Sequence, residues 1–215
     1  MTITLYNVDR SPPCAFVRSL AKHLAIDLKH KNLDFTNKEH CSDEYLKINP
    51  FHKVPAIDDE GFIVYESNAI AYYLLRKYAP ESKLYPTCIK TRTRIDQVLA
   101  CLSSNIYSAT VAFLLPRFVE NTKPTAEEKS AFEENVLRGL EHLIGDKFAV
   151  GETFTLADVA MTSLVATALE NNLVDYTKFQ KLRSYYERVK HEQPCFEEIY
   201  GPVLNNMRQL SARLK

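Results

Sequence analysis

Strand signals are confined to the first eighty residues of this chain, and long helical signals fill the rest. Before Ala79 short β-like runs alternate with amphipathic helices, whereas after the break at Pro80–Pro86 no strand pattern returns. The 215 residues suffice for one large domain or two smaller ones. We therefore predict an α/β domain over residues 1–79, a linker over 80–88 and an all-helical domain over 89–215.

The first domain is expected to alternate strands with helices. A proline suits a first helical turn, so a helix should open at Pro12, with Phe16 and Leu20 on its apolar face. A strand–helix–strand unit of this length implies a parallel pair, and the later hairpin adds an antiparallel one, which gives a mixed four-stranded sheet. The expected elements are strand Ile3–Tyr6, helix Pro12–Ile26, strand Lys29–Leu33, a helical turn from Ser42, strands from Val54 and over Phe62–Tyr65, and a helix capped by Ser67 that runs to Tyr78.

The second half should be a bundle of long helices. Thr125 and Glu128 form a capping-box pattern, and Thr155 and Asp158 form a similar one. The helix after Thr155 is apolar nearly all round, which predicts a place at the centre of the bundle. The expected helices are Ile89–Val119, Thr125–Ile144, Thr155–Glu170, Lys178–Glu192 and Cys195–Leu210.

Composition excludes several classes of function. Lys+Arg and Asp+Glu both number 27, and this neutral balance argues against a nucleic-acid binder. The five glycines form no phosphate-binding loop, and the six histidines have no zinc-ligand spacing, so neither a nucleotide nor a metal is expected. No signal peptide and no apolar run near 18 residues is evident, and the five cysteines form no C-x-x-C pair, so we expect a reduced, cytoplasmic protein without a membrane segment.

Ser11 is the first candidate functional residue. It precedes Pro12 at the helix N-cap, where free backbone N–H groups and the positive helix end attract negative charge. Ser11 and Cys14 also have the spacing of a C-x-x-C redox motif whose first cysteine is replaced by serine. A plain structural cap is the alternative interpretation.

Two further sites should lie on the same face if the domain is thioredoxin-like. A cis Val54–Pro55 bond would expose the backbone groups of Val54 for pairing with an extended peptide, whereas a trans proline would mark an edge strand. Glu66 and Ser67, at another helix start, suit an ammonium and a carboxylate, although simple capping is also open. Together the three sites describe a receptor for a short, charged peptide.

Four segments carry a resemblance to a known family. LYNVDRSPPC, EYLKINPFHKVPAI, YESNAIAYYL and TLADVAMTSL resemble cytosolic glutathione S-transferases of the insect delta and epsilon classes, and the resemblance covers nearly the whole chain. It implies a thioredoxin-like N-terminal domain, an all-helical C-terminal domain, a homodimer, and glutathione as co-substrate in a detoxifying conjugation.

The resemblance also implies roles for individual residues. Ser11 would hydrogen-bond the glutathione sulfur. The glutathione site would comprise His40 and His52 at the glycyl end, Lys53, Val54 and Pro55 at the cysteinyl backbone, and Glu66, Ser67 and Asn68 at the γ-glutamyl end. The family usually has Arg or His where this chain has Asn68, which predicts weaker glutathione binding. Arg10 stands where a small residue is common, and is either solvated or adds positive potential near the sulfur.

A serine hydroxyl at this place can ionise a bound thiol. A hydrogen bond to a charged group contributes roughly 1.5–3 kcal/mol, which lowers a thiol pKa by about one to two units. The same residue argues against thiol–disulfide exchange, because a hydroxyl cannot form a mixed disulfide, and Cys14 should be a buried, inert thiol.

An electrophile would need a hydrophobic pocket beside that sulfur. A stripe on the first long helix is the candidate wall: Tyr107, Val111, Leu114, Leu115 and Phe118, although each could be ordinary helix core. The favoured function is glutathione conjugation to a small hydrophobic electrophile. The alternatives are a non-catalytic binder of hydrophobic ligands with the same fold, or a glutathione-dependent peroxidase or isomerase.

Overall fold

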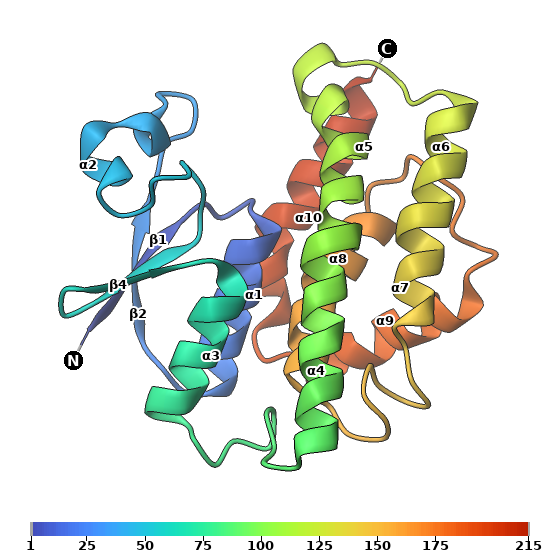
Figure 1. Ribbon diagram of the computed structural model, residues 1–215. Helices are drawn as coiled ribbons and strands as arrows, with labels where there is room; N and C mark the ends of the chain where they lie inside the picture. Colours follow the sequence, from blue (N-terminus) through green and yellow to red (C-terminus); the bar gives the residue numbers. More distant parts are fainter. Residues whose placement is uncertain (1, 215) are drawn as a thin grey trace.

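The computed structural model describes residues 2–214. A small sheet and a helical half lie on opposite sides of two helices, α1 and α3 (Figure 1). The first half consists of β1 Ile3–Asn7, α1 Pro12–His23, β2 Leu28–Asn32, a short 3₁₀ turn Glu39–Cys41, α2 Asp43–Leu46, β3 Ala56–Asp59, β4 Phe62–Tyr65 and α3 Ser67–Tyr78.

The sheet has the order β2-β1-β3-β4. β1 pairs with β2 in parallel, and β3 pairs with both β1 and β4 in antiparallel fashion. The predicted mixed four-stranded sheet is therefore confirmed. α1 ends at His23 rather than near Ile26, because the chain turns at Ala25, whose φ is +53°.

The second half contains helices throughout the described residues. Two of the long helices predicted from the sequence each contain one π turn, at 102–106 and at 133–137, where a single turn is wider than α. These turns lie close together, and a Cβ at Gly139 would lie 2.6 Å from Ile106 Cδ1. The helices are α4 Ile89–Cys101, α5 Tyr107–Glu120, α6 Ala126–Phe132, α7 Arg138–His142, α8 Leu156–Leu169, α9 Gln180–Glu192 and α10 Phe196–Arg213.

α8 is the central helix of this half. All of its 14 residues are buried, as its nearly all-round apolar sequence predicted. Its capping box is also formed: the Asp158 carboxylate accepts hydrogen bonds from both the backbone N–H and the hydroxyl of Thr155. These hydrogen bonds therefore fix the first turn of the central helix.

The two halves share one hydrophobic core. Phe16 and Leu20 of α1 and Leu75 of α3 belong to the same cluster as the buried side chains of α4, α5 and α8. A second cluster, which includes Leu5, Ile57 and Val17, fills the space between the sheet and α1. The interface between the halves is thus apolar and packed, so residues on either side of it hold a fixed relative position.

The prediction that the chain has no apolar run near 18 residues is wrong for the continuous helix Ile89–Glu120. It contains an 18-residue window with a mean hydropathy of 1.7, which is long and apolar enough to cross a membrane by length and composition alone. No apolar run of this kind was expected. The window is 39% buried within the fold, and the buried core helices of other folds pass the same test.

A buried ionic cluster ties α3 to the end of β3. The Asp59 side chain is inaccessible to solvent, and one of its carboxylate oxygens accepts hydrogen bonds from Tyr73 Oη (2.5 Å), Tyr78 Oη (2.6 Å) and Lys77 Nζ (2.7 Å). Burial would raise the pKa of Asp59, but these hydrogen bonds outweigh it and lower that pKa to about 2.

This cluster predicts a loss of stability in acid. Because the folded-state pKa of Asp59 lies below its ordinary value of about 3.9, the ionised carboxylate stabilises the folded protein above about pH 4, and this contribution is lost as the pH falls toward 2. In thermal unfolding followed by circular dichroism, Asp59→Asn should lower the Tm at pH 7 and flatten its fall between pH 4 and 2. If the Tm of Asp59→Asn fell between pH 4 and 2 as steeply as that of the wild type, the loss of stability in acid would come from other carboxylates.

Candidate active site

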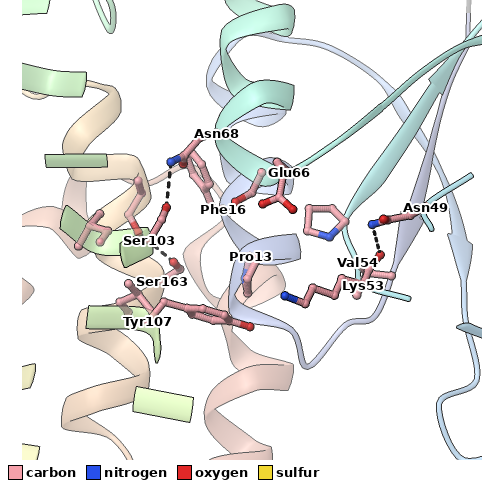
Figure 2. Close-up of a pocket in the computed structure, with 15 residues that line it drawn as sticks. Pro13, Phe16, Asn49, Lys53, Val54, Glu66, Asn68, Ser103, Tyr107 and Ser163 are labelled. Carbon is pink, nitrogen blue, oxygen red and sulfur yellow. Dashed lines mark hydrogen bonds between the residues drawn. The ribbon is translucent and has the colours of Figure 1, made fainter. Parts of the chain in front are cut away.

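A pocket of about 210 Å³ lies between the two halves of the molecule (Figure 2). Residues from both halves line it. The lining residues are Pro13, Phe16, Asn49, Lys53, Val54, Pro55, Glu66, Ser67 and Asn68 from the first half, and Leu102, Ser103, Tyr107, Ala160, Ser163 and Leu164 from the helical half. Six residues of the predicted glutathione site therefore share one cavity with one residue of the predicted hydrophobic wall, Tyr107.

Ser11 is not among the lining residues of this pocket. It is the N-cap of α1, with an extended backbone, and its Oγ accepts a hydrogen bond from Cys14 N at 3.4 Å. Pro13, two residues further on, lines the pocket. The half-buried Ser11 hydroxyl therefore lies two residues along the chain from the pocket lining. Pro12 and Pro13 carry no N–H, and the N–H groups of Cys14 and Ala15 donate to Ser11 itself, so the hydroxyl is the donor that this helix start can offer.

Cys14 is not available for redox chemistry. Its side chain is fully buried. Burial raises the pKa of its thiol to about 11, against the lowering effect of the Ser11 hydrogen bond. At neutral pH it is therefore a protonated, buried thiol, which agrees with the inert role expected from its place inside the helix.

The Val54–Pro55 peptide bond is cis, which decides between the two alternatives left open by the sequence. The turn before it is held at the carbonyl oxygen of Lys53, which accepts hydrogen bonds from Tyr45 Oη (2.6 Å) and Asn49 Nδ2 (2.8 Å). Asn49 also accepts a hydrogen bond from Phe51 N, in an Asx turn. Neither supporting residue was predicted from the sequence, although the Asn-Pro dipeptide at Asn49 is a recognised turn signal.

Glu66 occupies the N-cap of α3, the place predicted for Ser67. Ser67 is instead the first helical residue, and the Glu66 side chain makes no capping hydrogen bond. Glu66 has φ +69°, a left-handed conformation that costs of order 1–3 kcal/mol for a residue with a side chain. The exposed carboxylate and the uncapped helix start thus both border the pocket, which suits an ammonium beside a carboxylate.

Asn68 uses its side chain to join the two halves. Its Nδ2 donates to Ser103 Oγ at 3.0 Å (Figure 2). The same Nδ2 donates to the Leu99 carbonyl oxygen (3.3 Å), and Ser103 Oγ donates to that carbonyl as well. The amide donors are therefore directed to α4 and the π turn that follows it. The sequence alone offered no sign of these contacts, because the partners lie more than thirty residues away.

His40 and His52 do not line the pocket. The His40 ring stacks on Phe35, with 4.0 Å between the ring centroids, and within the described residues its buried Nδ1 has no hydrogen-bond partner. His52 is exposed, with φ +57°, one residue before Lys53. Both lie on the segment that leads to the cis-proline turn, outside the cavity itself.

The predicted hydrophobic wall is divided by the structure. Tyr107 lines the pocket, and Figure 2 shows its ring and the Lys53 side chain pointing toward one another. Desolvation, together with the nearby Cys14 and Glu66, raises the pKa of Tyr107, so its hydroxyl stays protonated. Val111, Leu115 and Phe118 continue along α5 as exposed residues, whereas Leu114 is only 6% exposed and belongs to the core.

Two parts of the wall were not predicted from the sequence. Leu102 and Ser103 come from the π turn between α4 and α5, and Ala160, Ser163 and Leu164 come from α8. α8 was predicted as the bundle centre, and its small residues at 160 and 163 leave room for the cavity. Across the described residues, no group of three or more His, Cys, Asp or Glu side chains is placed to hold a metal ion.

The fold and the pocket define a class of protein. An α/β domain that brings a cis-proline turn and two helix starts to one edge, closed by an all-helical domain, has the architecture of glutathione-dependent transferases. The sequence matches the family models for the glutathione S-transferase N-terminal domain over residues 1–76 and C-terminal domain over residues 92–193. The chain belongs to the glutathione S-transferase family.

Solved insect structures agree with this membership. A delta-class glutathione transferase from Nilaparvata lugens is 29% identical, with 99% of this chain and 100% of that chain covered and a TM-score of 0.90. Glutathione transferase BmGSTD1 from Bombyx mori is 30% identical over 100% and 98% of the two chains, with a TM-score of 0.87. An epsilon-class glutathione S-transferase from the housefly Musca domestica is 28% identical over 99% and 96%, with a TM-score of 0.86. The protein is thus a glutathione transferase with glutathione as its co-substrate.

Proposed function

We propose that Ser11 donates a hydrogen bond to the sulfur of bound glutathione and keeps it ionised. The observation that carries this proposal is that Ser11 is the N-cap of α1, at the positive end of the helix, two positions before Pro13, which lines the pocket. The hydroxyl stays protonated throughout, because it acts as a donor and not as a base. The ordinary thiol pKa of about 8.5 leaves only a few per cent of thiolate at pH 7, so this stabilisation raises the fraction of reactive sulfur.

The rest of glutathione would extend across the cis-proline turn and the start of α3. Glu66 receives the ammonium of the γ-glutamyl residue, and Ser67 with the N-terminal turn of α3 receives its carboxylate. The backbone of Val54, before Pro55, pairs with the cysteinyl residue, beside Lys53. His40 and His52 meet the glycyl carboxylate. Asn68 supplies no charge, since its amide donors are directed to Ser103 and Leu99, which supports glutathione binding weaker than in relatives with Arg or His there.

The reaction is a nucleophilic conjugation. The thiolate sulfur attacks the electrophilic carbon, a carbon–sulfur bond forms, and the leaving group departs with its bonding electron pair while the thiol proton goes to solvent. Tyr107 and the apolar lining of α8 would hold the electrophile against the sulfur, and Val111, Leu115 and Phe118 would extend this wall along α5. Leu114 is not included in this wall, because it is buried in the core.

A homodimer that works in the cytoplasm, in detoxification of small hydrophobic electrophiles, is part of the proposal. An apolar hollow on the outer face of β4 and α3 supports self-association: Phe62 is 56% exposed there, and Ile89 at the start of α4 is 73% exposed. Sedimentation equilibrium of the purified chain tests this part, and a monomer at micromolar concentration would contradict it.

The activity itself is tested by two measurements on the wild-type protein. We expect the ultraviolet band of the thiolate to appear when glutathione binds at neutral pH, and a chloronitrobenzene to be conjugated under the same conditions. A binding protein with the same fold would instead take up apolar ligands tightly and show neither the band nor turnover. Those two absences together would refute the proposed mechanism.

A further inference from the structure

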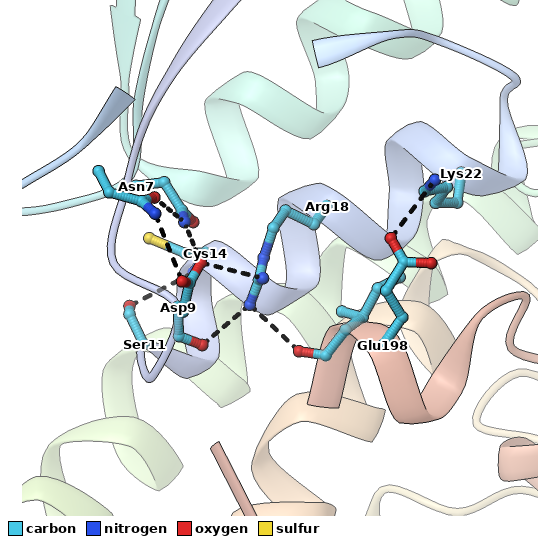
Figure 3. Close-up of polar contacts among 9 residues, drawn as sticks. Asn7, Asp9, Ser11, Cys14, Arg18, Lys22 and Glu198 are labelled. Carbon is cyan, nitrogen blue, oxygen red and sulfur yellow. Dashed lines mark hydrogen bonds and ion pairs between the residues drawn. The ribbon is translucent and has the colours of Figure 1, made fainter. Parts of the chain in front are cut away.

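One buried arginine joins the loop before Ser11 to α10 of the helical domain, which packs against α1. Arg18, on α1, is 7% exposed, and its Nη2 donates both to the Asp9 carbonyl oxygen (3.0 Å) and to the Ile199 carbonyl oxygen of α10 (3.1 Å). Its Nη1 lies 3.5 Å from Asp9 Oδ1. Figure 3 shows the guanidinium between Asp9 and the helix that carries Glu198. Burial of a guanidinium is unfavourable unless it is paired, so this arrangement holds the loop and α10 at a fixed distance.

Asp9 extends the connection into the sheet. Its Oδ1 accepts a hydrogen bond from Asn7 Nδ2 (2.7 Å), and its Oδ2 accepts one from Asn32 Nδ2 (3.4 Å). Asn7 ends β1, Asn32 ends β2, and Asn7 Nδ2 also donates to Asn32 Oδ1. The residue two positions before Ser11 is therefore fixed from the strands on one side and from Arg18 on the other.

Arg10 provides a second link from the same loop to α10. Its Nη1 donates to Asn206 Oδ1 at 3.3 Å, two helical turns beyond Ile199. This contact explains the arginine at a position where a small residue was expected. Both residues immediately before Ser11 are thus connected to α10, a helix that contributes no residue to the lining of the pocket.

We propose that Arg18 is a positioning residue for the reaction: through Asp9 and α10 it sets the place of the Ser11 hydroxyl relative to the glutathione sulfur. This inference rests on the proposed role of Ser11. Hydrogen-bond energy depends steeply on distance and angle, so a loop released from α10 would stabilise the thiolate less without changing the residues that hold the rest of glutathione.

The test is the pH dependence of conjugation by the full-length protein. Arg18→Met keeps the apolar stem and removes both links. It should move the acid limb of the pH–rate profile upward by about one unit, which is about tenfold in kcat below that pH, with a much smaller change in KM for glutathione. Arg18→Lys should shift the profile less, because a cation is retained at this position. Asn206→Ala, at a half-buried position on α10, should move the limb in the same direction by two- to threefold in kcat.

Lys22→Met is the matched control. It also removes an ion pair between α1 and α10, Lys22 to Glu198 at 3.7 Å, but one that does not touch the loop, so the profile should stay in place. The double variant Ser11→Ala/Arg18→Met should show no shift beyond that of Ser11→Ala, because the arginine acts through the serine. Additive shifts would mean that the arginine charge acts on the thiolate directly, and would overturn the inference.

These variants also distinguish failure of the inference about Arg18 from failure of the proposed role of Ser11. If Ser11→Ala leaves the profile unchanged, Ser11 is not the donor. If Ser11→Ala shifts the profile while Arg18→Met and Asn206→Ala leave it in place, only the positioning role is refuted. A fall in Tm without a shift in the profile would assign Arg18 to stability alone.

Discussion

Ser11→Ala is expected to lower kcat/KM for conjugation roughly ten- to hundredfold at pH values below the pKa of the bound thiol. The lost hydrogen bond to a charged sulfur is worth roughly 1.5–3 kcal/mol, and each 1.4 kcal/mol is about a factor of ten. The pKa of bound glutathione should rise by about one to two units, toward that of the free thiol. Ultraviolet titration of the bound thiolate and the pH–rate profile should report the same shift.

The shape of the profile is the decisive part of this prediction. Above the ordinary thiol pKa of about 8.5, glutathione is ionised without help, so the wild type and Ser11→Ala should converge there. Loss of activity by the same factor at every pH would mean that Ser11 acts on something other than sulfur ionisation. Thr125→Ala is a suitable control, because it removes another N-cap hydroxyl, bonded to Glu128 N at 3.2 Å, far from the pocket. It should lower Tm slightly and leave the profile unchanged.

The features that local chemistry dictates could be predicted from the sequence. Ser11, the Val54–Pro55 turn and the Glu66–Ser67 pair are short motifs at element boundaries, where capping groups and prolines restrict the backbone within a few residues. The mixed sheet followed from the same signals, since each strand was bounded by a turn. The exact N-cap of α3 was off by one residue, because Glu66 takes a positive φ that a sequence pattern does not favour.

The side chains that face the pocket depended on packing between distant elements. At about 100° per residue, Leu114 lies at the edge of the predicted stripe on α5 nearest the buried Thr110 and Arg117, so the core covers it. α8 is buried on every side, and its periodicity therefore could not indicate that Ala160 and Ser163 face a cavity. The same limit applies to Arg18 and Ile199, which lie 181 positions apart in the chain.

Asp158→Ala is expected to be the most destabilising substitution considered. Asp158 is fully buried, and its carboxylate accepts hydrogen bonds from the following donors: Ala149 N (2.7 Å), Thr155 N (2.8 Å), Thr155 Oγ1 (3.1 Å) and Tyr185 Oη (2.8 Å). Alanine would leave these donors buried without an acceptor, which should cost about 3–5 kcal/mol. For a protein of this length that corresponds to a fall in Tm of about 10 °C or more.

Asp175→Ala is the matched control for this effect. Asp175 likewise accepts hydrogen bonds from a backbone N–H and a hydroxyl of one threonine, Thr177, but it is exposed, so water can replace it. Its loss should change the free energy of unfolding by less than about 1 kcal/mol. Equal losses in the two variants, measured by urea unfolding, would show that burial at the start of α8 does not amplify the cost.

The consequence for activity follows from the position of Asp158. Ala160 and Ser163, on the first turns of α8, line the pocket, so loosening this end of the helix also moves the wall that holds the electrophile. Asp158→Ala should therefore raise KM for the electrophile in the fraction that remains folded, while the pKa of bound glutathione stays at the wild-type value. Ser11→Ala should do the reverse. If the pKa of bound glutathione shifted in Asp158→Ala, the bundle core would be mechanically coupled to the sulfur site. The position of Ser11 would then depend on α8 as well as on its links to α10.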